Sequence, residues 1–93
     1  MAKEFGYLDK YGILHAHPVE ETAKKYAGWN GKVAPTELAE DGGYIKLHGE
    51  TVFAYADEKK VLIGGNTIDH GGREVKFEEL PGELKELLIA VGF

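Results

Sequence analysis

Glycine and turn-forming residues divide much of this chain into short segments, and this spacing restricts the folds it can adopt. The sequence contains 13 glycines in 93 residues. Apolar runs too short for helices follow one another in its second half, separated by turn-forming residues. We expect strands joined by hairpins there, with Gly49-Glu50 as one tight turn. The expected strands are 44–48, 51–56, 61–63 and 74–77.

The N-terminal segment predicts a further hairpin. Short apolar runs at 5–8 and 13–17 flank Asp9-Lys10-Tyr11-Gly12. Asp and Gly are typical turn residues, because an Asp side chain can accept hydrogen bonds from the backbone that follows it and Gly tolerates positive φ. If 13–17 is a strand, His15 and His17 point to the same face.

Two segments have the spacing of amphipathic helices. Pro18 suits the first position of a helix, and apolar residues follow it at helical intervals until Gly28. We therefore predict a helix at 18–27. A leucine-rich stripe after Pro81 predicts a second helix at 82–91, ending at Gly92. Residues 35–38 are expected to form a single helical turn.

These elements predict one α+β domain over residues 1–93. We expect a mostly antiparallel sheet of about five or six strands, with two helices packed on one face. The expected core consists of the apolar residues that fall on the inner faces of these elements. They are Phe5, Tyr7, Leu14, Val19, Ala23, Ala27, Ile45, Leu47, Phe53, Tyr55, Val61, Ile63, Val75, Phe77, Leu84, Leu87 and Leu88.

One internal similarity links the two halves of the chain. Segments 5–14 and 53–62 share Phe, Tyr, Asp and Leu at matching positions, and both predict hairpins. Convergence of two amphipathic hairpins is the favoured explanation of the match, because hairpin chemistry is generic, and a duplication is the alternative. The stretch Gly6-Tyr7-Leu8-Asp9-Lys10-Tyr11-Gly12 resembles the hairpin unit of bacterial WG-type repeats. That resemblance covers about ten residues, without a tandem array or a Trp-Gly pair, and implies a hairpin rather than family membership.

Composition excludes several classes of site. The chain has neither cysteine nor serine, so thiolate metal sites, disulfides and a Ser-His-Asp triad are impossible. Its net charge is −5 and Arg73 is its single arginine, which disfavours nucleic acid as a partner. No apolar run is long enough to span a bilayer, so we expect no membrane partner. The absence of cysteine favours the cytoplasm.

The histidines suggest one alternative function. His15 and His17 could supply two imidazoles to a metal, with His48, His70 or Asp69 completing the set. However, two ligands are half of a tetrahedral site, and the neighbouring sequence offers no obvious carboxylate before Glu20 to orient them. We therefore expect these histidines to act as strand residues, with no metal site and no cofactor. A metal-binding domain using His15 and His17 is retained as an alternative.

A glycine-rich segment, residues 64–72, contains a second candidate site. Two glycine pairs enclose Asn66, Thr67, Asp69 and His70, which could converge on a ligand. The simpler interpretation is a wide hairpin loop. A small hydrolase or isomerase, with Asp69 orienting His70 as a general base, is the other alternative.

Aromatic residues support the leading interpretation of function. Five tyrosines and one tryptophan exceed what the core of so short a chain requires, and such residues are common at recognition surfaces. Tyr11 and Trp29 are the ones we expect to be exposed. The expected ligand-binding residues are Tyr11, Trp29, Asn66, Asp69 and His70. We predict a non-catalytic binding or interaction module. Its expected partner is another protein or a second copy of itself, in a weak homodimer through a strand edge or the last helix.

Overall fold

The computed structural model describes residues 4–65 and 72–93, and it is an α+β fold with two antiparallel sheets and two helices. The smaller sheet has the strand order β2-β1-β3. Its central strand, β1, pairs antiparallel with both neighbours. The three strands are β1 (Glu4–Leu8), β2 (Leu14–His17) and β3 (Val33–Thr36).

The larger sheet follows the chain order, β4-β5-β6-β7-β8, and is the expected meander. Its strands are β4 (Ala39–Asp41), β5 (Tyr44–Leu47), β6 (Glu50–Tyr55), β7 (Lys60–Gly65) and β8 (Gly72–Val75). The turn between β5 and β6 lies one residue earlier than predicted. His48 and Gly49 both have positive φ, 51° and 82°, as a two-residue type I′ hairpin turn requires.

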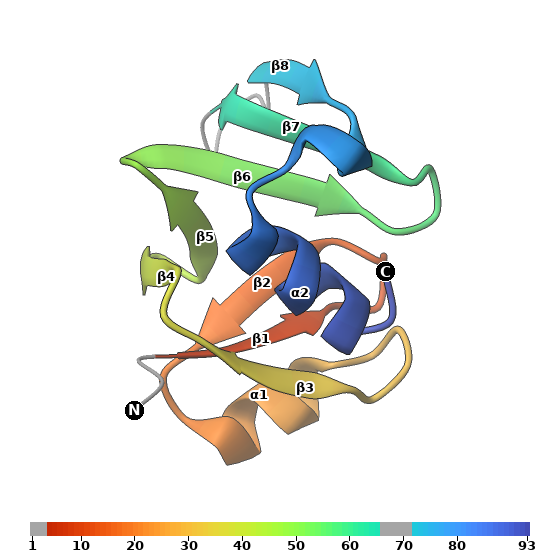
Figure 1. Cartoon of the computed structure of the whole chain (residues 1–93). Coiled ribbons are helices and arrows are strands. Elements are labelled where there is room, and N and C mark those ends of the chain that lie inside the picture. Colours follow the sequence, from red (N-terminus) through yellow and green to blue (C-terminus); the bar gives the residue numbers. More distant parts are fainter. Residues whose placement is uncertain (1–3, 66–71) are drawn as a thin grey trace.

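The helices lie on opposite faces of the smaller sheet (Figure 1). Helix α1 (Glu20–Tyr26) covers the outer face. Helix α2 (Gly82–Ala90) follows a short 3₁₀ turn, η1 (Phe77–Glu79), and lies between the two sheets. Neither helix in the described part of the chain has the length and apolar character to cross a membrane.

The expectation of a single sheet with both helices on one face is therefore wrong. Pro35 and Thr36, expected to begin a helical turn, instead end β3, which pairs with β1 on the side opposite β2, and residues 37 and 38 connect β3 to β4. Pro35 is tolerated there because β3 is an edge strand. Two sheets can enclose α2 from both sides, which buries more of its apolar surface than one sheet would.

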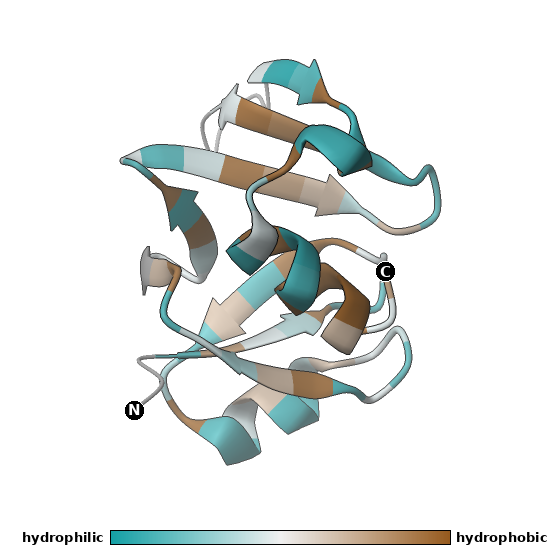
Figure 2. Ribbon diagram, in the orientation of Figure 1, coloured by the Kyte–Doolittle hydropathy of each residue, from teal (hydrophilic) through white to brown (hydrophobic). Residues whose placement is uncertain are grey.

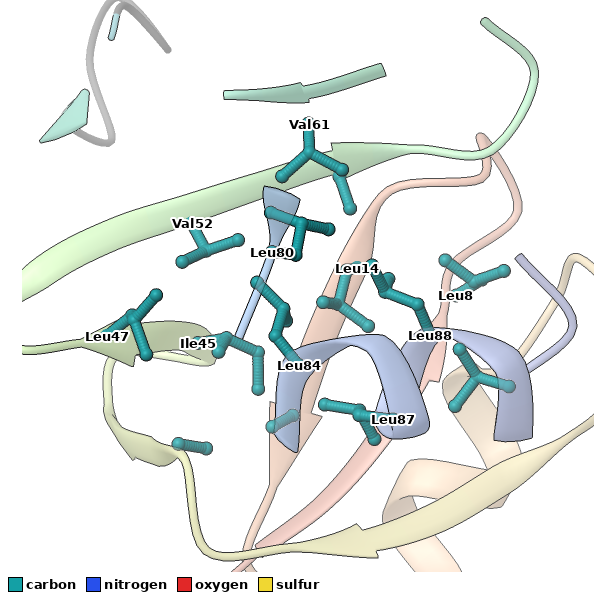
Figure 3. Close-up of a cluster of buried hydrophobic side chains, with 14 of the residues drawn as sticks. Leu8, Leu14, Ile45, Leu47, Val52, Val61, Leu80, Leu84, Leu87 and Leu88 are labelled. Atoms are coloured by element: carbon teal, nitrogen blue, oxygen red, sulfur yellow. The ribbon is translucent and has the colours of Figure 1, made fainter. Parts of the chain in front are cut away.

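The main core forms where α2 meets both sheets (Figure 3), and hydropathy colouring shows hydrophobic segments in α2, β6 and β7 (Figure 2). Most of the predicted core is confirmed, including Leu14, Ile45, Leu84 and Leu88, which are fully buried. Val19 is the clear error, since it is 51% exposed where the chain enters α1. Phe5, Tyr55, Val75 and Phe77 are only partly buried. Buried apolar residues that the prediction omitted include Leu8, Ala16, Val52, Ala54, Leu80 and Val91.

The two sheets are joined along the outer edge of β2. Ile13 forms an isolated antiparallel bridge with Tyr55, and the Ala56 N–H donates to the Gly12 carbonyl at 2.8 Å. At the other end of β2, the Ala16 N–H donates to the Gly43 carbonyl at 2.7 Å. The similar segments 5–14 and 53–62 both form hairpins, as predicted, and the loops of these hairpins meet at this junction.

Substitution of Gly12 tests how tightly this junction is packed. Gly12 has φ of 80°, and an added Cβ would lie 3.1 Å from the Trp29 ring and 3.3 Å from the Ala56 Cβ. Gly31 has a similar φ of 73° but no atom within 4 Å of such a Cβ. We expect Gly31→Ala to cost roughly 1 kcal/mol of unfolding free energy, from backbone strain alone. Gly12→Ala should cost about 1 kcal/mol more, because Trp29 and Ala56 must also move.

Urea denaturation of both variants measures this difference directly. Equal losses of unfolding free energy in the two variants would show that Trp29 and Ala56 move aside without cost.

Candidate ligand-binding site

One face of the first hairpin carries polar and aromatic side chains. Side chains alternate between the two faces of a strand, so Leu8 and Leu14 join the main core while Tyr7 and His15, which pair across the strands, face α1. His17 lies on the same face as His15. Both histidines therefore occupy positions in a strand and share a face, as predicted.

Asp9 links the hairpin turn to His15. One carboxylate oxygen, Oδ1, accepts the N–H groups of Tyr11 at 2.8 Å and Ile13 at 3.0 Å. The other, Oδ2, lies 2.8 Å from Nε2 of His15. A carboxylate only accepts, so Nε2 must be the donor in this contact, and in the neutral form of the imidazole Nδ1 then keeps its lone pair. Asp9 thus determines both the shape of the turn and the tautomer of His15.

The imidazole of His15 is also held by aromatic rings. The Tyr7 ring stacks on it at a centroid distance of 5.8 Å, and the Tyr44 ring lies tilted at 4.9 Å. The row continues at both ends, from Tyr7 to Tyr26 at 6.3 Å and from Tyr44 to Phe53 at 5.2 Å. Five aromatic side chains from α1, β1, β2, β5 and β6 therefore run across the junction of the two sheets. His15 has little freedom to reorient within this row.

His17 has a different role. Its Nδ1 accepts the Val19 N–H at 3.0 Å, just before the first turn of α1. The neutral ring must then carry its hydrogen on Nε2. Metal binding through Nε2 would require the hydrogen to move to Nδ1, which would break the bond from Val19. Within residues 4–65 and 72–93, no three His, Asp or Glu side chains are placed to hold a metal ion.

A pocket of about 440 Å³ opens between the hairpin turn and the last turn of α1. Tyr7 and His15 lie at its inner side, while Tyr11 and Tyr26 are 65% and 53% exposed. The Lys10 ammonium lies over the Tyr11 ring, 5.1 Å from its centroid. The complete lining is Tyr7, Asp9, Lys10, Tyr11, His15, Lys25, Tyr26 and Gly28. The pocket therefore combines aromatic walls with two cations, while both oxygens of its carboxylate already accept hydrogen bonds.

Burial changes the acidity of one wall residue. Removal from solvent raises the pKa of the Tyr7 phenol above its ordinary value of 10.0, and the negative charge of Asp9 raises this pKa further. The phenol therefore stays neutral throughout the physiological range. Outside the pocket, burial likewise raises the pKa of Tyr55, with Glu58 as the next cause.

The predicted ligand-binding residues do not all converge here. Tyr11 is exposed, as expected, and lines the pocket. Trp29 is 41% exposed, but its ring packs beside Gly12 and is not part of the pocket lining. Asn66, Asp69 and His70 lie outside the described residues. His48 occupies the turn between β5 and β6.

The sequence interpretation missed the role of Asp9. The expectation that no carboxylate near His15 could orient it is wrong, because Asp9 was treated only as a turn residue. The available signal was the hairpin register: if Leu8 pairs with Leu14, then Asp9 and His15 lie on one face, close enough to bond. Tyr7 is buried, as predicted, and also lines the pocket, whereas Tyr26, which the sequence did not single out, is exposed there.

The chain matches no protein-family model, no curated protein and no solved structure at a significant level.

Metal titration tests the assignment of the histidine tautomers. We expect Zn²⁺ or Ni²⁺ to leave the melting temperature within about 1 °C of its value in EDTA, because binding to both histidines would break the bond from Val19 to His17. A double variant, His15→Ala with His17→Ala, serves as the control. A rise of several degrees with metal, absent from the double variant, would show that the two rings do bind metal together.

The Tyr7 pKa tests the electrostatic influence of Asp9. We expect Asp9→Asn to lower this pKa towards 10.0 but not to reach it, because burial is the larger cause. Asparagine retains an oxygen for the N–H groups of Tyr11 and Ile13. Because the folded-state pKa is raised, stability should fall as the pH rises above about 10, and this fall should be smaller in Asp9→Asn.

Tyrosinate absorbance measured against pH, with Tyr7→Phe to identify the Tyr7 contribution, gives the pKa. An unchanged Tyr7 pKa in Asp9→Asn would contradict the proximity of the two groups.

Proposed function

We propose that this chain is a non-catalytic binding module and that its ligand occupies the pocket between the first hairpin and α1. The observation that carries this proposal is the pairing of a fixed inner wall with exposed aromatic rings. Tyr7 and His15 are held by packing and by Asp9, whereas Tyr11 and Tyr26 remain accessible to a partner. A volume of about 440 Å³ lies within the usual range for small ligands or a bulky side chain.

The lining residues favour an aromatic group accompanied by a negative charge. Tyr7, Tyr11 and Tyr26 offer ring faces and edges for stacking. Lys10 and Lys25 supply two positive charges, in a chain whose overall charge is −5. A partner protein could present such a group as a tryptophan or phenylalanine next to acidic residues. The cytoplasmic location expected from the sequence is proposed with it.

Catalysis is the less favoured alternative. The Asp9–His15 pair has the geometry of a general base and the carboxylate that orients it. It is therefore a better catalytic candidate than the Asp69–His70 pair predicted from the sequence, which lies outside the described residues. However, the His15 ring lies against Tyr7 and Tyr44, and its side chain is only 18% exposed. This packing favours a structural role for His15 in the wall of the pocket.

Weak self-association is a second proposal carried over from the sequence. The sequence suggests self-association through an excess of apolar residues on the last helix. Leu84, Leu87, Leu88 and Val91 are buried within the chain's own core, and Ile89 alone among the described residues of that stripe is strongly exposed, at 67%. Sedimentation over a range of concentrations tests a dimer separately from the pocket.

Titration of a peptide into the isotope-labelled chain tests the pocket. The probe is a short capped peptide with a tryptophan flanked by glutamates, and its counterpart has lysines instead of the glutamates. We expect the acidic peptide to shift the amide resonances of Tyr7, Tyr11 and Tyr26. Tyr26→Ala should weaken its binding about fivefold, since one aromatic contact contributes about 1 kcal/mol.

The control is Ile89→Ala, which removes another exposed apolar side chain that is not part of the pocket lining. Binding that is equally strong in Tyr26→Ala and the unaltered protein would reject the proposed site. Preference for the lysine peptide at the same resonances would reject the proposed ligand charge.

A further inference from the structure

A second hollow lies on the other face of the smaller sheet, between β3 and α2, with a volume of about 620 Å³. It is larger than the pocket described above, and the two share no lining residue. Ala34 and Leu87 are buried at its base, and Pro35 is exposed on the β3 side. We call this hollow the β3–α2 groove.

The α2 side of the β3–α2 groove is one stripe of the helix. Residues 83, 86, 87 and 90 recur at helical spacing, so they follow a single face along the axis. Leu87 and Ala90 provide apolar surface, while Glu83 and Glu86 are exposed beside it. Across the groove, Glu37 follows the end of β3. Apolar contact and negative charge are thus combined within one hollow.

The charge of the β3–α2 groove is one-sided. Among the described residues that line it, three are glutamates and none is lysine, arginine or histidine. The two glutamates of α2 are three residues apart on the same face, where like charges repel each other weakly. A cationic partner would relieve this repulsion, whereas an anionic one would increase it.

The edge of β3 restricts how a partner can bind. β3 is an edge strand, and such strands commonly recruit an additional strand through free N–H and C=O groups. Pro35 lies opposite Phe5 in the pairing with β1 and has no N–H to offer on its outer side. Continuous strand addition is therefore interrupted in the middle of β3. Recognition must depend mainly on side chains.

We propose that the β3–α2 groove binds an extended, lysine-bearing segment of another protein. Apolar side chains of the segment contact Leu87 and Ala90, and its ammonium groups approach Glu83 and Glu86. This proposal is independent of the pocket beside His15, which carries two lysines and favours the opposite ligand charge. The two sites would allow the chain to hold two different partner segments at once.

The test uses a short capped peptide of alternating lysine and leucine, titrated into the ¹⁵N-labelled full chain. We expect amide shifts at Thr36, Leu38 and residues 86–90, and weaker binding as salt is raised. Glu83→Gln with Glu86→Gln should raise the dissociation constant about three- to tenfold, the effect of losing two exposed ion pairs. The single variant Glu86→Gln should give about half of that effect on a logarithmic scale. It keeps Glu83, so its result still holds if loss of Glu83 weakens the first turn of α2.

The matched control is Glu78→Gln with Glu79→Gln, which removes the same charge from exposed residues of η1 outside the groove. Unchanged binding in this control supports a local site. Equally weakened peptide binding in both double variants would show that only the overall charge of the protein matters, and it would overturn the proposal. Shifts confined to other surfaces, or equally tight binding of a glutamate–leucine peptide, would also overturn the proposal. Shifts in the groove that appear when the protein concentration alone is raised would overturn it too, because they would identify a second copy of the chain as the occupant.

Discussion

The burial of α2 between the two sheets is the constraint on which the rest of this structure depends. Leu84 and Leu88 are completely buried, and Leu87 nearly so, where the helix meets strands of both sheets. The smaller sheet accepts the helix closely because Gly6 has no side chain. A Cβ at that position would lie 2.8 Å from a methyl carbon of Leu87. Exposure of this apolar surface would cost several kcal/mol, so the helix stabilises the association of the two sheets in addition to their direct hydrogen bonds along β2.

The position of α2 also determines where binding surfaces can form. Because α2 and the larger sheet occupy one face of the smaller sheet, the opposite face is left to α1. That helix has seven residues and buries little beyond Ala23, with the adjoining Ala27 also covered. It leaves the end of the face near the hairpin turn uncovered, and the aromatic pocket lies there. The β3–α2 groove arises similarly, where α2 passes the free edge of β3.

Asp9 connects local structure to the pocket. Its carboxylate accepts two backbone N–H groups of the turn and the Nε2 hydrogen of His15. Loss of this one side chain would therefore affect the turn, the orientation of the imidazole and the pKa of Tyr7 together. Such concentration of roles in one residue is compatible with a preorganised binding site, in which the inner wall needs no rearrangement when a ligand binds.

The sequence by itself determined the local elements of this protein. Turn residues located the hairpins, the apolar stripe located α2, and alternation along 13–17 placed His15 and His17 on one face. These features depend on residues close together in the chain, where backbone geometry leaves few choices. Helix boundaries, and the turn at His48-Gly49, were correct only to within a few residues. The helical turn predicted at 35–38 is wrong because the strand partner of Pro35 and Thr36, β1, is distant in sequence.

Only the tertiary structure decided the division into two sheets, the enclosure of α2 and the composition of the pocket beside His15 and of the β3–α2 groove. The hydrogen bond between Asp9 and His15 depends on the register of the first hairpin. The contact of His15 with Tyr44 depends on the junction between the two sheets. Glu83 and Glu86 line a groove only because β3 lies beside α2. The physical reason is that side-chain periodicity indicates which face of an element is apolar, whereas the element that covers this face is selected by packing across the whole chain.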